Sequence, residues 1–299
     1  MKFRNIAMCL TAVAGLVLSS CIREDRSDCY NVYMLELSYL GDGTEEIFAE
    51  KIDKVRMYVF DDSGNCIVSR QISDEDVRSR VTQLPPLEEG DYRVVCVGNA
   101  YSTRVEGLSS GNLNSVFFAA GSYLDGSEVS GNDPLYWASV TYHVVPFDEY
   151  RQVETVKASF ASSHYDISVE VSGVPAVKSD GYPLVQLVGV SPCTDFTNRA
   201  FGEPVTYQME TAHDGDRTLK AYNNIMRHTN HEDVWVRVYT PDQKELLAEI
   251  NFAQFLNKYS DMIDVTKNEV LIPFQIIFKP TEVTIKLPSW FVETVRPIL

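Results

Sequence analysis

The residues with the clearest potential for chemistry are Leu18, Ser19, Ser20 and Cys21, which place a thiol at the end of an apolar N-terminal run. This run spans residues 6–18 and follows a short basic end. It is too short to cross a bilayer comfortably, and its flanks are those of a secretory signal. A hydrophobic residue, two small residues and a cysteine resemble a bacterial lipobox, in which the cysteine thiol accepts a diacylglycerol and becomes the new N-terminus. The pattern therefore predicts lipidation of Cys21.

Lipidation at this position divides the N-terminal region into two parts. Residues 1–20 are expected to be a lipoprotein signal peptide, and the polar residues 21–29 a lipidated tether that lifts the body of the protein off the membrane. An ordinary signal peptide followed by a chance cysteine is the alternative. A transmembrane anchor is disfavoured because Arg23, Glu24 and Asp25 follow the cysteine almost at once.

The composition is that of an acidic globular protein. The chain has 299 residues, of which 44% are hydrophobic and 11% aromatic, and a disordered tail would contain fewer of both. Its formal net charge of −16 disfavours electrostatic binding to nucleic acid or to anionic lipid. Acyl chains on Cys21 would therefore have to hold the protein at the membrane.

Four further cysteines follow the lipidated one: Cys29, Cys66, Cys96 and Cys193. They are scattered and have no CxxC spacing, so a metal site is not expected. Disulfides can form outside the cytoplasm, but four cysteines allow three complete pairings and the sequence does not choose between them. Buried free thiols are an equally good interpretation.

No other motif predicts an active site. Residues 107–111 match the G-x-S-x-G pattern of a nucleophile elbow, but the residues before them are too polar for the buried strand that such an elbow requires. The polar run at residues 228–233 contains two histidines, yet a loop before the next strand explains it without a metal. We therefore expect no catalytic residue, metal, cofactor or small-molecule substrate. Trp290 is the tryptophan expected to be exposed, where it could bind a carbohydrate.

Short apolar runs separated by turn residues predict an all-β protein. The first strand has a period-two set that would line one face: Tyr33, Leu35, Leu37 and Tyr39. Residues 55–60 begin a hairpin that turns at 61–65 and returns at 66–68. Residues 113–124 have helical spacing instead, and Asn251 could cap a second helix whose apolar stripe extends to Ile263. The strand count suits two tandem β-sandwich domains with one or two short helices, at residues 30–152 and 153–299.

Several stretches, taken in order, resemble the family of minor fimbrial anchor lipoproteins found in bacteria of the Bacteroides–Porphyromonas group. Residues 21–29 are similar to the lipidated start of that family, including its second cysteine. Residues 55–64 resemble its first long strand and turn, and residues 87–99 resemble its glycine-tyrosine strand that ends in Gly-Asn. The second half matches more loosely, through residues 167–173 and the hairpin at 274–287.

This resemblance implies both a fold and a role. The implied fold is two transthyretin-like, Greek-key β-sandwiches joined by a short linker. The implied role is that of a non-enzymatic anchor or minor subunit of a type V pilus, which fixes the pilus to the outer membrane at the cell surface through its N-terminal lipid. The implied partner is a fimbrillin stalk subunit. Subunits of such pili polymerise by strand exchange, in which an extended segment of one subunit completes a sheet of the next.

Strand exchange leads to two expectations about this chain. We expect no proteolytic cut between Cys21 and the strand at residues 55–60, because such a cut would separate the body from its lipid. The candidate strand-exchange segment is then the C-terminal one, in which Val283, Ile285 and Leu287 share a face. The alternative is that this strand closes its own sheet. The alternative function is a stand-alone surface lipoprotein adhesin that binds a glycan or a host protein.

Overall fold

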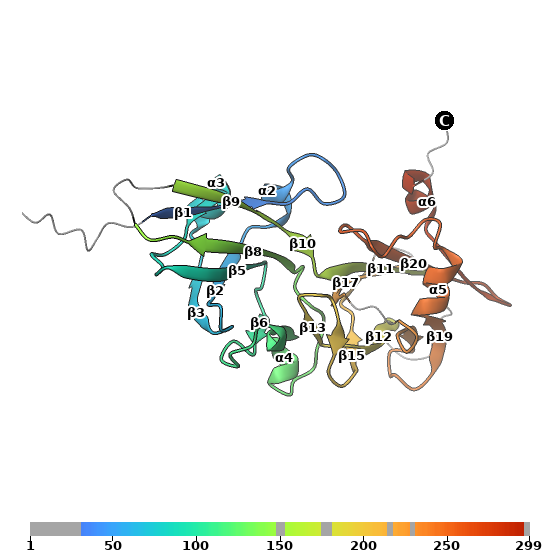
Figure 1. The fold of residues 1–299 in the computed structure, drawn as a ribbon. Helices are drawn as coiled ribbons and strands as arrows, with labels where there is room; N and C mark the ends of the chain where they lie inside the picture. Colours follow the sequence, from blue (N-terminus) through green and yellow to red (C-terminus); the bar gives the residue numbers. More distant parts are fainter. Residues whose placement is uncertain (1–30, 148–152, 175–180, 214–217, 228–230, 296–299) are drawn as a thin grey trace, which may run out of the picture.

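The computed structural model describes residues 31–147, 153–174, 181–213, 218–227 and 231–295. Figure 1 shows these residues as two groups of strands that follow one another along the chain, with short helices at the periphery. The strands form five sheets, so the all-β class expected from the sequence is confirmed. Among the described residues, no helix has the length and apolarity that a membrane span requires.

Two sheets form the N-terminal β-sandwich. The smaller one has the strand order β4 (Val81–Gln83), β1 (Val32–Ser38) and β9 (Val153–Ser159). The larger one has the order β10 (Ala161–Ser162), β8 (Tyr136–Val144), β5 (Gly90–Gly98), β2 (Val55–Phe60) and β3 (Cys66–Gln71). Strands β2 and β3 pair as an antiparallel hairpin, which confirms the predicted turn between them.

The alternation along β1 builds the core of this sandwich. Tyr33, Leu35, Leu37 and Tyr39 are all buried, as the period-two pattern predicts, and Leu35 and Leu37 are completely inaccessible to solvent. These side chains pack with the inward-facing residues of the larger sheet in one hydrophobic cluster. Strand β1 has neighbours on both sides, because it pairs antiparallel with β4 and parallel with β9.

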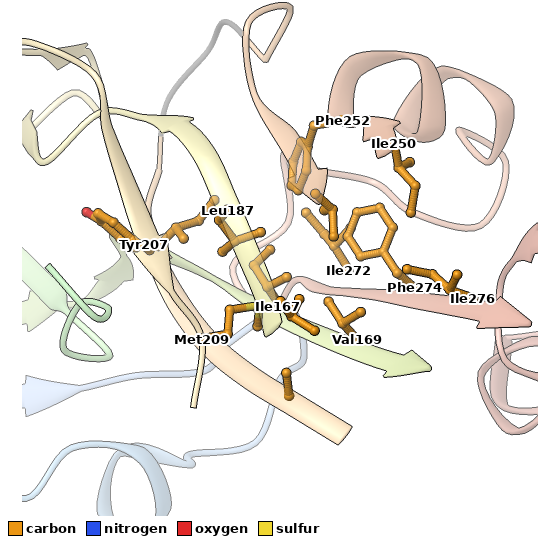
Figure 2. Close-up of a cluster of buried hydrophobic side chains, with 14 of the residues drawn as sticks. Ile167, Val169, Leu187, Tyr207, Met209, Ile250, Phe252, Ile272, Phe274 and Ile276 are labelled. Carbon is orange, nitrogen blue, oxygen red and sulfur yellow. The ribbon is translucent and has the colours of Figure 1, made fainter. Parts of the chain in front are cut away.

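Two further sheets form the C-terminal β-sandwich. The first has the order β16 (Thr211–His213), β17 (Leu219–Met226), β11 (His164–Ser172), β20 (Leu271–Phe278) and β21 (Val283–Lys286). The second has the order β15 (Val205–Gln208), β12 (Leu184–Val190), β18 (Trp235–Tyr239) and β19 (Leu246–Asn251). Figure 2 shows the core between them, in which Ile167 and Phe274 of the first sheet lie close to Leu187 and Phe252.

The fifth sheet joins the two halves of the chain. Its order is β14 (Ala200–Phe201), β13 (Cys193–Asp195), β7 (Phe117–Ala120) and β6 (Thr103–Glu106). The helix predicted over residues 113–124 is therefore wrong. That segment contains a 3-10 helix, η1 (Leu113–Ser115), then β7, then the short helix α4 (Gly121–Leu124). Pairing of β7 with both β6 and the distant β13 overrides the local helical spacing.

Strands β9 and β10 lie in the sheets of the N-terminal sandwich, although they follow residue 152, where the sequence pattern places the start of the second domain. All seven residues of β9 pair with β1, and β10 pairs with β8. The first strand in the sheets of the C-terminal sandwich is β11, which begins at His164. By strand pairing, the change from one sandwich to the other thus falls between Ser162 and His164.

The helices are short and lie outside the sheets. The side chain of Asn251 accepts the backbone N–H of Gln254 at 3.0 Å, which confirms the predicted cap of helix α5 (Phe252–Lys258). This helix ends at Lys258 rather than continuing to Ile263. Besides α4, the other helices of the described chain are α2 (Phe48–Lys51), α3 (Asp74–Ser79) and α6 (Ser289–Val295).

Candidate functional site

The candidate site is one edge of the five-stranded sheet in the C-terminal sandwich, which strand β21 provides. Its neighbour β20 lies in the interior of the sheet and holds β21 in place. Ile272, Phe274 and Ile276 of β20 are completely inaccessible to solvent. On its other side β20 pairs parallel with β11 over seven positions, so at this end of the sheet the outer side of β21 has no partner strand among the described residues.

A tight turn fixes how β21 lies against β20. The backbone N–H of Lys279 donates to the carbonyl of Glu282 at 2.9 Å. The two side chains also pair, with 2.6 Å between Lys279 Nζ and Glu282 Oε1. The hydrogen bond with the Lys279 ammonium holds the pKa of the exposed Glu282 carboxyl below its usual value. Pro280 within this turn presets a φ angle that suits it.

The register of the hairpin determines which backbone groups face outward. Ile276 lies opposite Ile285, and Phe278 lies opposite Val283. Because the Lys279 and Glu282 backbones are bonded to each other, the alternation of an antiparallel ladder turns the N–H and C=O groups of Val283 and Ile285 away from β20. Among the described residues, none forms a backbone hydrogen bond with these outward groups.

The three side chains of the predicted strand-exchange face lie in different environments. Leu287 is buried, Ile285 is half-buried against the C-terminal core, and Val283 is 41% exposed. Two of the three therefore anchor β21 to its own sandwich, as the alternative of a strand that closes its own sheet requires. The strand nevertheless forms the edge of that sheet, and its outer side is open along the described chain.

Helix α6 continues from this edge towards the C-terminus. Trp290 is 46% exposed, in agreement with the expectation for this tryptophan, and Val295 is also exposed. Phe291 and Val292 are partly buried against the C-terminal core. The helix thus docks one face on the sandwich and presents an apolar residue from the other face to solvent.

The predicted lipid attachment site lies outside the described residues, which include none of Leu18, Ser19, Ser20, Cys21 and Cys29. The structure does show where the chain goes after this segment. It enters strand β1 at Val32, in the middle of the smaller N-terminal sheet.

The three cysteines that the structure describes are free thiols. Cys96 and Cys193 are buried, and Cys66 is half-buried. Burial raises the pKa of Cys96 to about 12 and that of Cys193 to about 11. Cys96 and Cys193 are therefore buried free thiols, Cys66 is a half-buried one, and no disulfide joins any two of the three.

Of the two motifs that could suggest catalysis or a metal, the structure describes residues 107–111 in full and residues 228–233 only from His231 onward. Residues 107–111 form a loop between β6 and η1, and Gly107 has a φ of +80° close to the carbonyl of Ser115. This is not the buried strand and helix of a nucleophile elbow. His231 packs against the ring of Phe252, while residues 228–230 lie outside the described part. Over the described residues, no three histidine, cysteine, aspartate or glutamate side chains come together in a group that could hold a metal ion.

The sequence did not reveal a cavity of about 500 Å³ on the outer face of the larger N-terminal sheet. Arg93 and Trp137 of that sheet line it together with Phe196 and Arg199, which follow β13. Residues so far apart in the chain meet only because of the shared fifth sheet. No local signal could have identified the cavity, and Trp137 alone is typical of a core residue.

Comparison with known proteins identifies the family. The family model described as fimbrillin-A associated anchor proteins Mfa1 and Mfa2 matches residues 26–296. The structure of the fimbrial anchor protein Mfa2 from Porphyromonas gingivalis aligns with a TM-score of 0.63 at 13% sequence identity, covering 86% of this chain and 95% of that chain. No curated protein sequence matches the chain.

Two solved structures described as candidate adhesins have the same fold. One, from Bacteroides ovatus, aligns with a TM-score of 0.66 at 16% identity, over 87% of this chain and 95% of that chain. The other, from Bacteroides thetaiotaomicron, aligns with a TM-score of 0.63 at 17% identity, over 86% and 96%. Since the family model covers nearly the whole sequence, this chain belongs to the family of fimbrillin-A associated anchor proteins Mfa1 and Mfa2.

Proposed function

We propose that this chain is a lipid-anchored, non-enzymatic fimbrial anchor or minor subunit, which holds a fimbrillin stalk at the outer membrane. Membership of the anchor family supports the role, and the lipobox ending in Cys21 supports the attachment. The observation that carries the proposal is the position of β1. A chain that enters the middle of a sheet directly after its lipidated tether connects the membrane to the folded body without a break.

An anchor of this kind must keep its first strand. Strand β1 is hydrogen-bonded to β4 on one side and to β9 on the other, and its inward side chains fill the N-terminal core. Two hydrogen bonds from β8 and the loop after it also hold β1 in place. The Tyr142 hydroxyl donates to the Met34 carbonyl, and the Val145 N–H donates to the Tyr33 hydroxyl at 3.0 Å. Removal of β1 would expose this core and cut the link to the lipid.

The edge strand β21 is the proposed point of contact with the stalk. The outward N–H and C=O groups of Val283 and Ile285 can pair with an extended segment of a fimbrillin subunit, which would add a sixth strand to the five-stranded sheet. Val283 would contribute side-chain contact, because it is exposed where the added strand would lie.

Proline substitutions test this edge without disturbing the hairpin. Proline lacks the backbone N–H, and at Val283 or Ile285 this donor faces away from β20. We expect Val283→Pro and Ile285→Pro to leave the fold intact and to release stalks from the cells into the medium. Ser69→Pro is the matched control, since it removes an outward N–H from β3, at the edge of a different sheet.

The readout is the fraction of fimbrillin found in the medium, measured beside urea unfolding of each purified variant. If both variants unfold like the natural protein and retain stalks as well as Ser69→Pro does, β21 is not the contact. That result would leave the anchoring role itself untouched, because lipid attachment at Cys21 is tested separately.

A further inference from the structure

The cavity at the junction of the two sandwiches has the composition of a ligand site. Its volume of about 500 Å³ lies within the range of pockets that hold small molecules. Arg93 comes from β5, Trp137 and Ser139 come from β8, and Asn114 comes from η1. The segment from Asp195 to Arg199 closes the opposite side.

Aromatic rings form one wall of this cavity, and their positions are fixed. The ring centres of Trp137 and Phe196 lie 5.4 Å apart at an angle of 40°. Phe196 also meets Phe118 edge to face, with 5.0 Å between ring centres. Phe118 is completely inaccessible, so the wall rests on the buried cluster under the fifth sheet. A rigid aromatic wall can bind the apolar face of a ring without loss of side-chain entropy.

Positive charge lines the cavity, although the protein is strongly acidic. Arg93 is exposed and forms no ion pair or side-chain hydrogen bond within the described part of the chain. Arg199 Nε donates to Asp195 Oδ2 at 3.1 Å, which leaves the terminal nitrogens of its guanidinium available. Two arginines and one aspartate give the lining a net positive charge, whereas the whole chain carries −16.

The single carboxylate of the cavity is already satisfied. One oxygen of Asp195 accepts the backbone N–H and the hydroxyl of Thr197, at 2.8 and 2.6 Å, and the backbone N–H of Arg199 at 3.0 Å. These bonds, with the Arg199 guanidinium, lower the pKa of Asp195 despite its burial. Asp195 thus shapes the turn that carries Phe196 and Arg199, and the two arginines remain to meet an anion.

We propose that this cavity binds an acidic saccharide, one with a carboxylate on its sugar ring. Its carboxylate would pair with the guanidinium groups of Arg93 and Arg199, which match carboxylate geometry. The C–H face of its ring would lie on the Trp137–Phe196 wall. Its hydroxyl groups would meet the side chains of Ser139 and Asn114, neither of which has a side-chain partner among the described residues.

Titration of the full lipidated protein in detergent micelles tests the assignment. The probes are 3′-sialyllactose and digalacturonic acid, with lactose as the neutral control. We expect both acidic sugars to bind, at least tenfold more tightly than lactose, and to weaken as salt increases. Arg93→Gln should weaken their binding at least tenfold without affecting the fold, because Arg93 is exposed and unpaired within the described chain.

A matched arginine separates the cavity from general charge. Arg78→Gln changes an exposed arginine on helix α3, which does not line the cavity, and should leave binding unchanged. Equal affinities for lactose and the acidic sugars would overturn the proposal, and so would equal affinities of Arg93→Gln and the natural protein. A glutamate-rich peptide that binds through Arg93 while neither acidic sugar binds would also overturn it, in favour of a protein ligand.

Discussion

Asp42 in the N-terminal half accepts the backbone N–H of Asn268 in the C-terminal half at 2.8 Å, and its second oxygen accepts the N–H of Glu269 at 2.9 Å. The side-chain N–H of Asn268 donates to the carbonyl of Gly41 at 3.1 Å, and its side-chain oxygen accepts a hydrogen bond from the backbone N–H of Ser162. Together with the shared fifth sheet, these bonds fix the two sandwiches to each other. A protein that holds a stalk to a membrane, as proposed here, needs such a joint because the load passes through both sandwiches.

The contact between the two sandwiches can be weakened by removing the carboxylate of Asp42. Asp42→Ala leaves the two backbone N–H groups without their acceptor, and because water can partly replace it at the surface, we expect a loss of about 1–2 kcal/mol in the free energy of unfolding. Urea unfolding measures this loss. Asp62→Ala is the control, since Asp62 is exposed in a turn, and an equal effect of the two substitutions would contradict the role of Asp42.

The first strand should behave as part of the core. Leu35→Ala removes a side chain that is completely inaccessible, so we expect it to lower the free energy of unfolding by about 2–5 kcal/mol. Glu36→Ala, on the opposite face of the same strand, should change it by less than about 0.5 kcal/mol. Similar small effects of both substitutions in urea unfolding would show that β1 is dispensable.

The indole N–H of Trp137 is a buried hydrogen-bond donor without an acceptor among the described residues. Its indole Nε1 has no hydrogen-bond partner within the described chain, and burying such a group is costly. Trp137→Phe removes the donor while keeping an aromatic wall, so we expect a change in unfolding free energy within about 1 kcal/mol. Trp137→Ala should cost about 3–5 kcal/mol. Equal losses for the two variants would mean that the indole nitrogen is satisfied in solution.

The thiols of the buried cysteines should not react with alkylating reagents in the folded protein. Because burial raises the pKa of Cys96 to about 12 and that of Cys193 to about 11, both are neutral thiols at pH 8. We expect neither to react with iodoacetamide at this pH until urea unfolds the protein. Peptide mass spectrometry would read the labels, and rapid labelling or a disulfide-linked peptide in the native sample would contradict the expectation.

Local patterns predicted the elements whose structure depends on nearby residues. The alternation of Leu35 and Leu37 predicted the buried face of β1, and the turn at residues 61–65 predicted the β2–β3 hairpin. The cap at Asn251 was correct for the same reason, because a capping side chain bonds to a backbone group only three residues away.

Features that depend on distant pairing could not be predicted. Phe117–Ala120 form a strand because they pair with Cys193–Asp195. Val153–Ser159 join the first sandwich because they pair with the side of β1 that β4 leaves unpaired. The cavity combines Arg93 with Arg199 through the same long-range contacts. The pattern of β21 identified a strand with one apolar face, but only the sheet order shows that its outer side is open.

The proposed anchoring role depends on the thiol of Cys21. Replacing Cys21 by alanine in the living cell removes the proposed site of lipidation, which lies outside the described residues. The decisive measurement is the fraction of fimbrillin fibres that appears in the culture medium. We expect fibres and the variant protein to be shed together into the medium, whereas fibres that stay on the cells as in the natural strain would contradict the proposed anchoring role.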